Sequence, residues 1–183
     1  MLLETLILAI VISMLSGGKL SRLGSLHLRE FWLVPLALII QSGIYWTAVR
    51  GIGIGPSWLS PALDTGSYFL LLIFSFRNRS LPGMRWITLG IFLNTLVISL
   101  NGGVMPVDPT FLPEAIRKVL LAGQGTHGLM TATTRLSFLA DRFYLVIPGF
   151  EKQLFSPGDC IIDIGCFWIV FKTMRKREIP LDS

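Results

Sequence analysis

Residues 58–76, WLSPALDTGSYFLLLIFSF, are followed directly by the loop RNRSLPGMR (77–85) and by WITLGIFLNTLVISL (86–100). A helix needs about 20 mainly apolar residues to cross a bilayer, and both long segments come close to that length. The loop between them contains three Arg and no acid. An excess of Lys and Arg in a short loop marks the cytoplasmic side of a membrane protein. This region therefore predicts two membrane helices joined by an inner loop.

The whole chain has the composition of a membrane protein. Of its 183 residues, 52% are hydrophobic and 15% are charged, and the mean hydropathy is +0.66. Soluble domains contain about 25% charged residues. We therefore do not expect the isoelectric point of about 9.6 to reflect binding to nucleic acid. The basic residues are expected instead to mark the inner face and to contact anionic lipid headgroups.

On either side of the central hairpin, further apolar segments predict transmembrane helices within one integral membrane domain, residues 1–183. The five expected helices are 2–16, 31–49, 58–76, 84–100 and 159–173. Ten of the sixteen Lys and Arg residues fall in the alternate segments 16–30, 77–85 and 172–183, together with three acids. On the other side the remaining six bases are matched by six acids, two of which, Glu4 and Asp159, lie at the outer ends of the first and last expected helices. This asymmetry predicts an all-α membrane protein with its N-terminus outside and its C-terminus inside.

Residues 101–158 form the longest outer segment, and they are too varied for a plain connector. Asn101, Gly102 and Gly103 are expected to end the fourth helix in a sharp turn, because Gly adopts positive φ at little cost. The prolines that follow predict an extended segment at 104–109. Apolar residues at helical spacing predict a helix at 110–122 that lies flat in the outer interface. The remaining expectations for this compact outer cap are a strand or a dip into the interface at 143–148 and a loop at 150–158.

Two carboxylates of the outer side, Asp141 and Asp159, are the candidate catalytic residues. An ionisable group at membrane depth is a functional hypothesis by default. When two carboxylates are neighbours, one can keep a proton while the other activates water. Each also has a structural interpretation. Asp159 follows Ser-Pro-Gly and fits a helix N-cap, whereas Asp141 can pair with Arg135 or Arg142.

The other polar candidates carry less specific signals. Asp64 and Asp163 lie inside apolar segments, where we expect them to bond to polar groups of neighbouring helices or to lie near the outer surface. His127 could ligate a metal or a pigment ring or hydrogen-bond to a quinone, with a hydrogen-bonded surface role as the alternative. Because the chain has only two Cys, the sequence indicates neither a disulfide framework nor a thiolate metal site. The residues expected to form binding or structural parts of the cap are Asn101, Gly102, Gly103, His127, Arg135 and Arg142.

The end of the chain resembles that of bacterial lipoprotein signal peptidases. The resemblance rests on LAD (139–141), an aromatic-rich stretch, and FSPGDCIIDIG (155–165). In those enzymes two catalytic aspartates have a comparable spacing, and the second opens the last membrane helix. The resemblance therefore implies that Asp141 and Asp159 form an aspartyl peptidase dyad. Ser156 and Arg142 stand where the family pattern has an asparagine and a phenylalanine.

A second resemblance extends over the whole chain. The segments GGKLSRLG (17–24), NGGVMP (101–106), RLSFLAD (135–141) and GD (158–159) resemble a family of small bacterial membrane proteins with no assigned function. This resemblance implies a location in the bacterial cytoplasmic membrane and nothing about mechanism.

Taken with the lack of a nucleotide or nucleophile motif, these observations favour a non-catalytic subunit or partner of a larger membrane assembly. Such a protein would dock through its helices and outer cap and could bind a lipid, a quinone or a pigment, although the sequence identifies no cofactor. The alternative is an aspartate-dyad membrane peptidase that uses Asp141 and Asp159. Membrane lipids and other membrane subunits are the expected partners, and nucleic acid is not.

Overall fold

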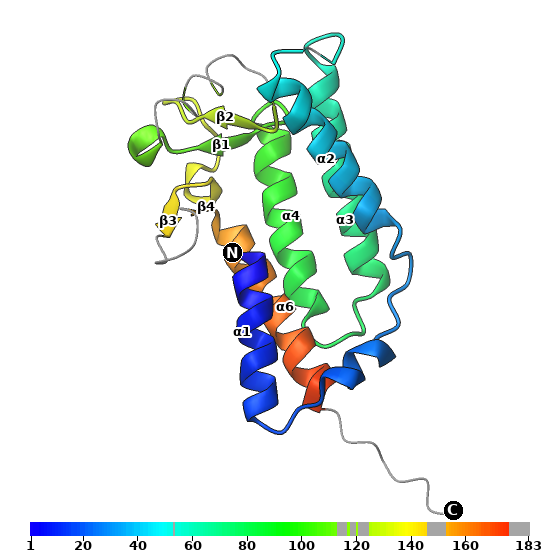
Figure 1. Cartoon of the computed structure of the whole chain (residues 1–183). Helices are drawn as coiled ribbons and strands as arrows, with labels where there is room; N and C mark the ends of the chain where they lie inside the picture. The colour runs from blue at the N-terminus through cyan, green and yellow to red at the C-terminus, as the bar shows by residue number, and fades with distance from the viewer. Residues whose placement is uncertain (53, 113–116, 118–119, 121–124, 146–152, 176–183) are drawn as a thin grey trace, which may run out of the picture.

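The structure is a computed structural model that describes residues 1–52, 54–112, 117, 120, 125–145 and 153–175 (Figure 1). The protein is mostly helical. Long helices lie in each of the five segments for which hydropathy predicts them, and their ends agree with the expected ones to within two residues. They are α1 (Leu2–Leu15), α2 (Leu33–Val49), α3 (Leu59–Arg77), α4 (Met84–Leu100) and α6 (Pro157–Arg175).

Within the described part of the chain, α3 is the one helix that is both long and apolar enough to cross a membrane. Helices α1, α2 and α4 are apolar but shorter, with 14 or 17 residues. Helix α6 has 19 residues, but four of them are charged: Asp159, Asp163, Lys172 and Arg175. By length and composition alone, the described helices therefore include one candidate span.

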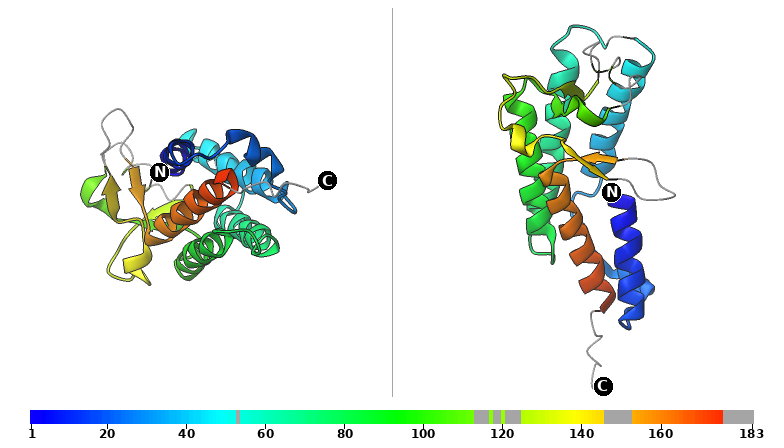
Figure 2. Two further views of the ribbon diagram at one scale, coloured as in Figure 1. Left: turned by 90° about the horizontal axis from the view of Figure 1, so that it is seen from below. Right: turned by 90° about the vertical axis from the view of Figure 1, so that its left-hand side faces the viewer.

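The helices form two sets that are displaced from each other along the bundle axis (Figure 1). Helices α2, α3 and α4 lie side by side, whereas α6 packs against both α4 and α1. Seen along the bundle, α6 lies between α1 and the α3–α4 pair (Figure 2). Because Gly158 at the start of α6 lies against Gly90 in α4, α6 begins partway along α4 rather than beside its cap end. The far ends of α1 and α6 consequently extend beyond those of α3 and α4.

Glycines allow the close contact between α4 and α6. Gly83 lies against Gly165 and Gly90 lies against Gly158, with a separation of seven residues on each side. A Cβ added to Gly165 would lie 2.7 Å from the Gly83 carbonyl oxygen, and one added to Gly90 would lie 2.7 Å from Ile162 Cγ1. Small residues at a helix interface let the backbones approach, which is a common way for helices to pack in lipid. We call these four residues the glycine seam.

Asn78 organises the end of the bundle that carries the basic residues. Its side chain accepts a hydrogen bond from the Arg29 N–H and donates one to the Arg29 carbonyl oxygen, both at 2.8 Å. These bonds hold the connection between the 3-10 helix η1 (Leu20–Ser25) and α2 against the end of α3. Within η1, the Arg22 guanidinium donates to the Met174 carbonyl oxygen of α6 at 2.9 Å. The two helix sets are therefore tied together at this end as well.

The cap contains two small β-sheets, which corrects the all-α expectation. Strand β1 (Met105–Val107) pairs in parallel with β2 (His127–Leu129), and β3 (Phe143–Leu145) pairs antiparallel with β4 (Gln153–Phe155). Each strand has three residues. That length is too short for an alternating pattern to reveal it in the sequence.

Some of the expectations for the cap agree with the structure and others do not. Strand β1 lies in the segment expected to be extended, and β3 agrees with the strand alternative at 143–148. The loop expected at 150–158 is wrong in part, because β4 forms there by pairing with β3 and α6 begins at Pro157. The helix expected at 110–122 lies mainly outside the described residues. At its start the chain forms the short 3-10 helix η2 (Pro109–Phe111).

Alanine substitutions test the glycine seam. We expect Gly90→Ala and Gly165→Ala to lower the free energy of unfolding by about 1–3 kcal/mol, because the added Cβ has no space between the helices. The matched control is Gly66→Ala in α3, where an added Cβ has nothing within 4 Å. The better helix propensity of Ala should leave that variant unchanged or slightly stabilised. Thermal unfolding in mild detergent makes the comparison, and equal melting temperatures for seam and control variants would contradict the close packing.

Candidate functional site

Helix α6 begins with a capping box formed by Ser156 and Asp159. The Ser156 hydroxyl oxygen lies 3.1 Å from the Asp159 backbone nitrogen, and Asp159 Oδ2 accepts the Ser156 N–H at 2.9 Å. This reciprocal arrangement satisfies amide groups that the first helical turn leaves without partners. The expectation that Asp159 is the N-cap is therefore wrong in its position. Ser156 precedes the helix as the N-cap, and Asp159 is the third helical residue.

Asn94 of α4 completes a buried polar triad with these two residues. Its Nδ2 donates to Asp159 Oδ1 at 2.8 Å, and its Oδ1 lies 3.0 Å from Ser156 Oγ. Asn94 is 2% exposed and Ser156 is fully buried, so water does not replace a lost partner here. Sequence reasoning did not single out Asn94, although one amide inside an apolar helix is the signal that could have identified it.

A cavity of about 490 Å³, which we call the outer cavity, lies beside the triad. Four helices contribute polar residues to its wall, namely Gln41, Tyr68, Asn94, Asp159 and Asp163, and apolar residues such as Leu71, Ile91 and Ile162 line the rest. One oxygen of Asp163 accepts the Thr5 hydroxyl of α1 at 2.9 Å, as expected for a carboxylate that bonds to a neighbouring helix. The cavity is therefore an amphiphilic space with two carboxylates at its border.

A second feature of the cap is the contact between His127 and Asp141. The Asp141 N–H donates to the Pro106 carbonyl oxygen at 3.0 Å, which fixes this residue beside β1. Its side chain is 9% exposed, and Oδ2 lies 3.4 Å from His127 Nε2. The other oxygen, Oδ1, has no hydrogen-bond partner among the described residues. In this part of the chain His127, rather than Arg135 or Arg142, is thus the ionic partner of Asp141.

His127 and Asp141 change each other's ionisation. Burial raises the pKa of Asp141 above 3.8 because the charged form is poorly solvated, and His127 opposes this shift. Partial burial by itself lowers the pKa of His127, but the hydrogen bond and charge of Asp141 outweigh it and raise that pKa above 6.5. The charges of Asp64 and Asp159 act in the same direction on His127. The two groups therefore titrate as a coupled pair, in which each favours the charged form of the other.

A smaller cavity, of about 250 Å³, opens beside the His127–Asp141 pair. Tyr45 and Ala48 of α2 line it together with the pair and with Leu154 of β4. Leu154 also lines the outer cavity. The Leu154 side chain of the cap therefore belongs to the walls of both cavities.

Asp64 is a buried carboxylate near the cap end of α3. It is 1% exposed, and neither of its oxygens has a hydrogen-bond partner among the described residues. Of the two expectations for Asp64, a bond to a neighbouring helix is not found among the described residues, and a place near the outer surface stays a prediction. It interacts electrostatically with His127 and lies one turn before Tyr68, which lines the outer cavity. Because an unpaired buried acid is costly, its burial beside these polar groups sets this part of the bundle apart from an ordinary apolar core.

The residues expected at the end of α4 have structural roles. Asn101 Nδ2 donates to the Arg135 carbonyl oxygen, and its Oδ1 accepts the Arg135 N–H, both at 2.9 Å. Gly102 and Gly103 have φ of +75° and +82°, which forms the predicted sharp turn. Arg142 is exposed. The hydrogen bonds between Asn101 and Arg135 therefore hold the cap against the end of α4. Arg142, by contrast, lies at the surface.

The structure gives Asp141 and Asp159 different partners. Asp159 is bound by Ser156 and Asn94, whereas Asp141 faces His127, and no hydrogen bond joins the two carboxylates in the described residues. The same residues contain no group of three or more His, Cys, Asp or Glu side chains that could hold a metal. The peptidase dyad stays a prediction that no observed contact supports.

Residues 25–171 match a family of unknown function, DUF5317. The chain belongs to this family. The prediction of membership in a family without an assigned function is thus confirmed, and the matched region includes the triad and the His127–Asp141 pair. The chain is also similar to an uncharacterized protein from Thermotoga maritima, with 25% identity over 178 residues that cover 97% of this chain and 93% of that protein. No solved structure matches the chain.

The His127–Asp141 pair predicts a pH-dependent stability. Because folding raises the pKa of His127, its contribution is complete below about pH 6.5 and is lost as the pH rises through the folded-state pKa. Burial raises the pKa of Asp141, so the folded state takes up this proton more readily than the unfolded chain and its protonation at acid pH does not lower stability. We expect His127→Gln to abolish the loss of stability on the alkaline side, which amounts to about 0.5–1 kcal/mol, a size typical of a partly exposed pair.

Thermal unfolding from about pH 5 to 9 measures this effect. His27→Gln provides the matched control, because His27 is an exposed histidine that contacts the Ser25 carbonyl oxygen and no acid. The two single variants should differ in their pH profiles. A His127→Gln profile that follows the wild type throughout would show that the pair contributes nothing.

Proposed function

We propose that this protein is a small multi-pass protein of the bacterial cytoplasmic membrane that acts by binding rather than by catalysis. In this proposal the outer cavity holds a small amphiphilic molecule, and the helices and cap dock against other membrane subunits. The observation that carries the proposal is the convergence of polar and acidic side chains from four helices on one cavity. In an otherwise apolar bundle, such residues mark binding sites.

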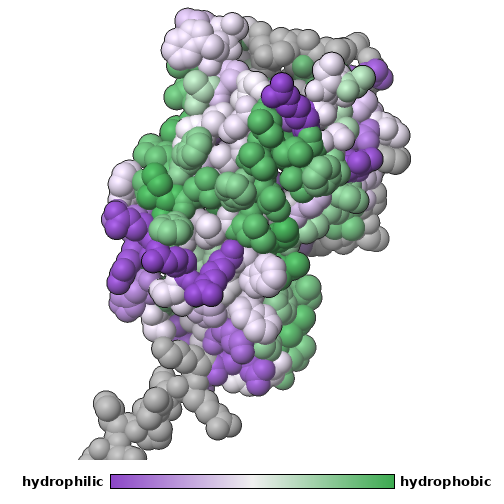
Figure 3. Space-filling view, turned by 180° about the vertical axis from the view of Figure 1, so that it is seen from behind, coloured by the Kyte–Doolittle hydropathy of each residue, from purple (hydrophilic) through white to green (hydrophobic). Residues whose placement is uncertain are grey.

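The surface of the helices supports insertion into a bilayer. Every long helix exposes large apolar side chains, among them Leu3, Leu8, Ile39, Phe69, Ile73, Trp86, Phe92, Ile164 and Trp168. Seen from behind, the molecule carries a broad hydrophobic band with hydrophilic side chains beneath it (Figure 3). Soluble monomers rarely expose apolar patches of this extent, whereas lipid contact requires them. The band therefore favours burial in hydrocarbon.

The lengths and charges of the helices agree with the proposed topology. Helices α2, α3 and α4 contain 17 to 19 residues, or roughly 25–29 Å at 1.5 Å per residue, close to the ~30 Å hydrocarbon thickness. The basic segments 16–30 and 77–85 then lie inside, and the cap lies outside. Because α6 begins partway along α4, the Asn94–Ser156–Asp159 triad sits at membrane depth. There its mutual hydrogen bonds replace those that water would supply.

The wall of the outer cavity indicates the chemistry of the ligand. Asp159 and Asp163 present carboxylate oxygens, which accept hydrogen bonds, at its border. The apolar side chains that line the rest of the cavity, including Leu71 and Ile91, suit a hydrocarbon or ring body. A volume of about 490 Å³ lies within the usual range for ligand pockets. We therefore infer an amphiphile that bears amine or hydroxyl donors, a description that some lipids and a quinol meet.

Native mass spectrometry after gentle detergent extraction tests this ligand. We expect a bound amphiphile on the wild type, and a loss of about tenfold or more in occupancy for Asp163→Asn, because a hydrogen bond to a charged group is lost. Leu71→Trp should reduce occupancy by filling the cavity. Asp108→Asn is the control, because this carboxylate lies in the cap and accepts from Thr110 outside the cavity. An empty wild type, or equal occupancy in all variants, would overturn the ligand proposal.

Cysteine labelling of intact cells tests the topology separately. In a background with Cys160 and Cys166 replaced by Ser, we expect a membrane-impermeant maleimide to label Thr133→Cys, an exposed position of the cap. Ser80→Cys, an exposed position in the basic loop between α3 and α4, should react only after the membrane is opened. Labelling of both positions in intact cells, or the reverse pattern, would contradict the proposed orientation.

A further inference from the structure

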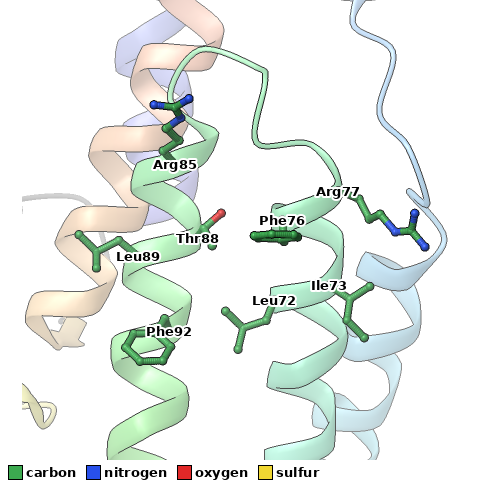
Figure 4. Close-up of a pocket in the computed structure, with 8 residues that line it drawn as sticks. All are labelled: Leu72, Ile73, Phe76, Arg77, Arg85, Thr88, Leu89 and Phe92. Atoms are coloured by element: carbon green, nitrogen blue, oxygen red, sulfur yellow. The ribbon is translucent and has the colours of Figure 1, made fainter.

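We propose that the groove between α3 and α4 at their basic end binds one anionic phospholipid of the inner leaflet. This inference rests on the membrane insertion proposed above, but not on the ligand of the outer cavity. The groove has a volume of about 580 Å³ and is lined by residues of these two helices only. It lies at the opposite end of the helices from the cap (Figures 1 and 4).

The body of the groove is apolar and open to the surroundings. Leu72 and Phe76 of α3 and Phe92 of α4 border the space between the helices, with Thr88 facing it from α4 (Figure 4). Phe76 is 57% exposed and Phe92 is 50% exposed, so the described protein does not cover either ring. The groove follows the helix axes, which is the direction that an acyl chain takes in a bilayer. Its walls therefore offer a channel for hydrocarbon rather than for water.

The end of the groove is positively charged. Arg77 is the last residue of α3 and Arg85 lies in the first turn of α4, so the helical hairpin places both at the same level. Neither guanidinium has an ion-pair or hydrogen-bond partner within the described residues. A third cation, Arg79, lies over the Phe76 ring at 4.3 Å. The α4 N-terminus adds the positive end of its helix dipole.

The apolar walls and the positively charged end of the groove together indicate which kind of molecule binds there. Phosphate is the group that arginine binds best through paired hydrogen bonds, and basic sites between helices on the cytoplasmic side suit anionic headgroups. A second apolar helix would leave Arg77 and Arg85 without partners against its surface. A soluble phosphate compound would leave the exposed apolar walls uncovered. An anionic phospholipid supplies both a phosphate group for the arginines and acyl chains that cover the apolar walls.

Binding of two lipids with identical acyl chains, phosphatidylglycerol and phosphatidylcholine, to the purified full chain tests the site. Native mass spectrometry should show a preference for phosphatidylglycerol in the wild type. We expect Arg77→Gln and Arg85→Gln each to weaken phosphatidylglycerol binding about fivefold, and the double variant roughly thirtyfold, with no matching change for phosphatidylcholine. Both positions are exposed, so these variants should fold. Thr88→Trp should weaken the binding of both lipids by filling the groove.

Arg50→Gln and Arg142→Gln are the charge-matched controls, because both arginines are exposed and lie outside the groove. Equal losses in these variants, or a wild type without lipid preference, would overturn the site. Asp163→Asn, at a position that lines the outer cavity and not the groove, should keep the lipid preference. If the preference fails while Ser80→Cys still reacts only from inside, the lipid site is wrong and the proposed membrane topology stands.

Discussion

The hydrogen bonds between Asn94 and the Ser156–Asp159 capping box determine the depth at which α6 begins. Asn94 lies past the middle of α4, so α6 begins partway along α4 rather than beside its cap end. Strand β4 directly precedes α6, and its Leu154 lines the outer cavity. Removing one partner would leave a buried amide or carboxylate unsatisfied at a cost of about 1–3 kcal/mol, or more for the charge. The cavity, the cap and the second helix set therefore depend on one small polar contact.

The two ends of the bundle differ in the burial of their charged side chains. Near the cap, acids are buried and either paired, as Asp141 is with His127, or unpaired, as Asp64 is. At the other end Arg77, Arg79 and Arg85 are exposed, and Arg77 and Arg85 have no ion-pair or hydrogen-bond partner in the described chain. Buried groups impose fixed geometry because a low dielectric strengthens each contact, while exposed cations are free to meet an external anion. This contrast agrees with the internal site proposed at the cap end and with the lipid site proposed at the basic end.

The amino-acid sequence predicted the five helices well because their apolar runs are long and bounded by charges or glycines. The turn at Asn101–Gly103 was equally accessible, since two glycines directly after an apolar helix favour the positive φ that ends it. The displacement of α6 was not predictable, because it results from a contact between residues 62 to 65 positions apart. The strands of the cap were too short to give a pattern, and the partner of Asp141 lay in another strand rather than beside it. For the candidate site, the sequence identified Asp159, Asp141 and His127 as notable, but not Asn94, which joins two elements.

The equal spacing of the glycine seam has a consequence for how α4 and α6 choose their register. Because the glycines recur every seven residues on both sides, the helices could also slide by one repeat, about 10 Å, and still bring one pair of glycines together. Shape alone distinguishes these registers weakly. The Asn94 amide meets Ser156 and Asp159 in the observed register, and a slip of one repeat in either direction would separate it from both partners. A single polar residue at a helix interface can thus select one alignment among several that pack almost as well.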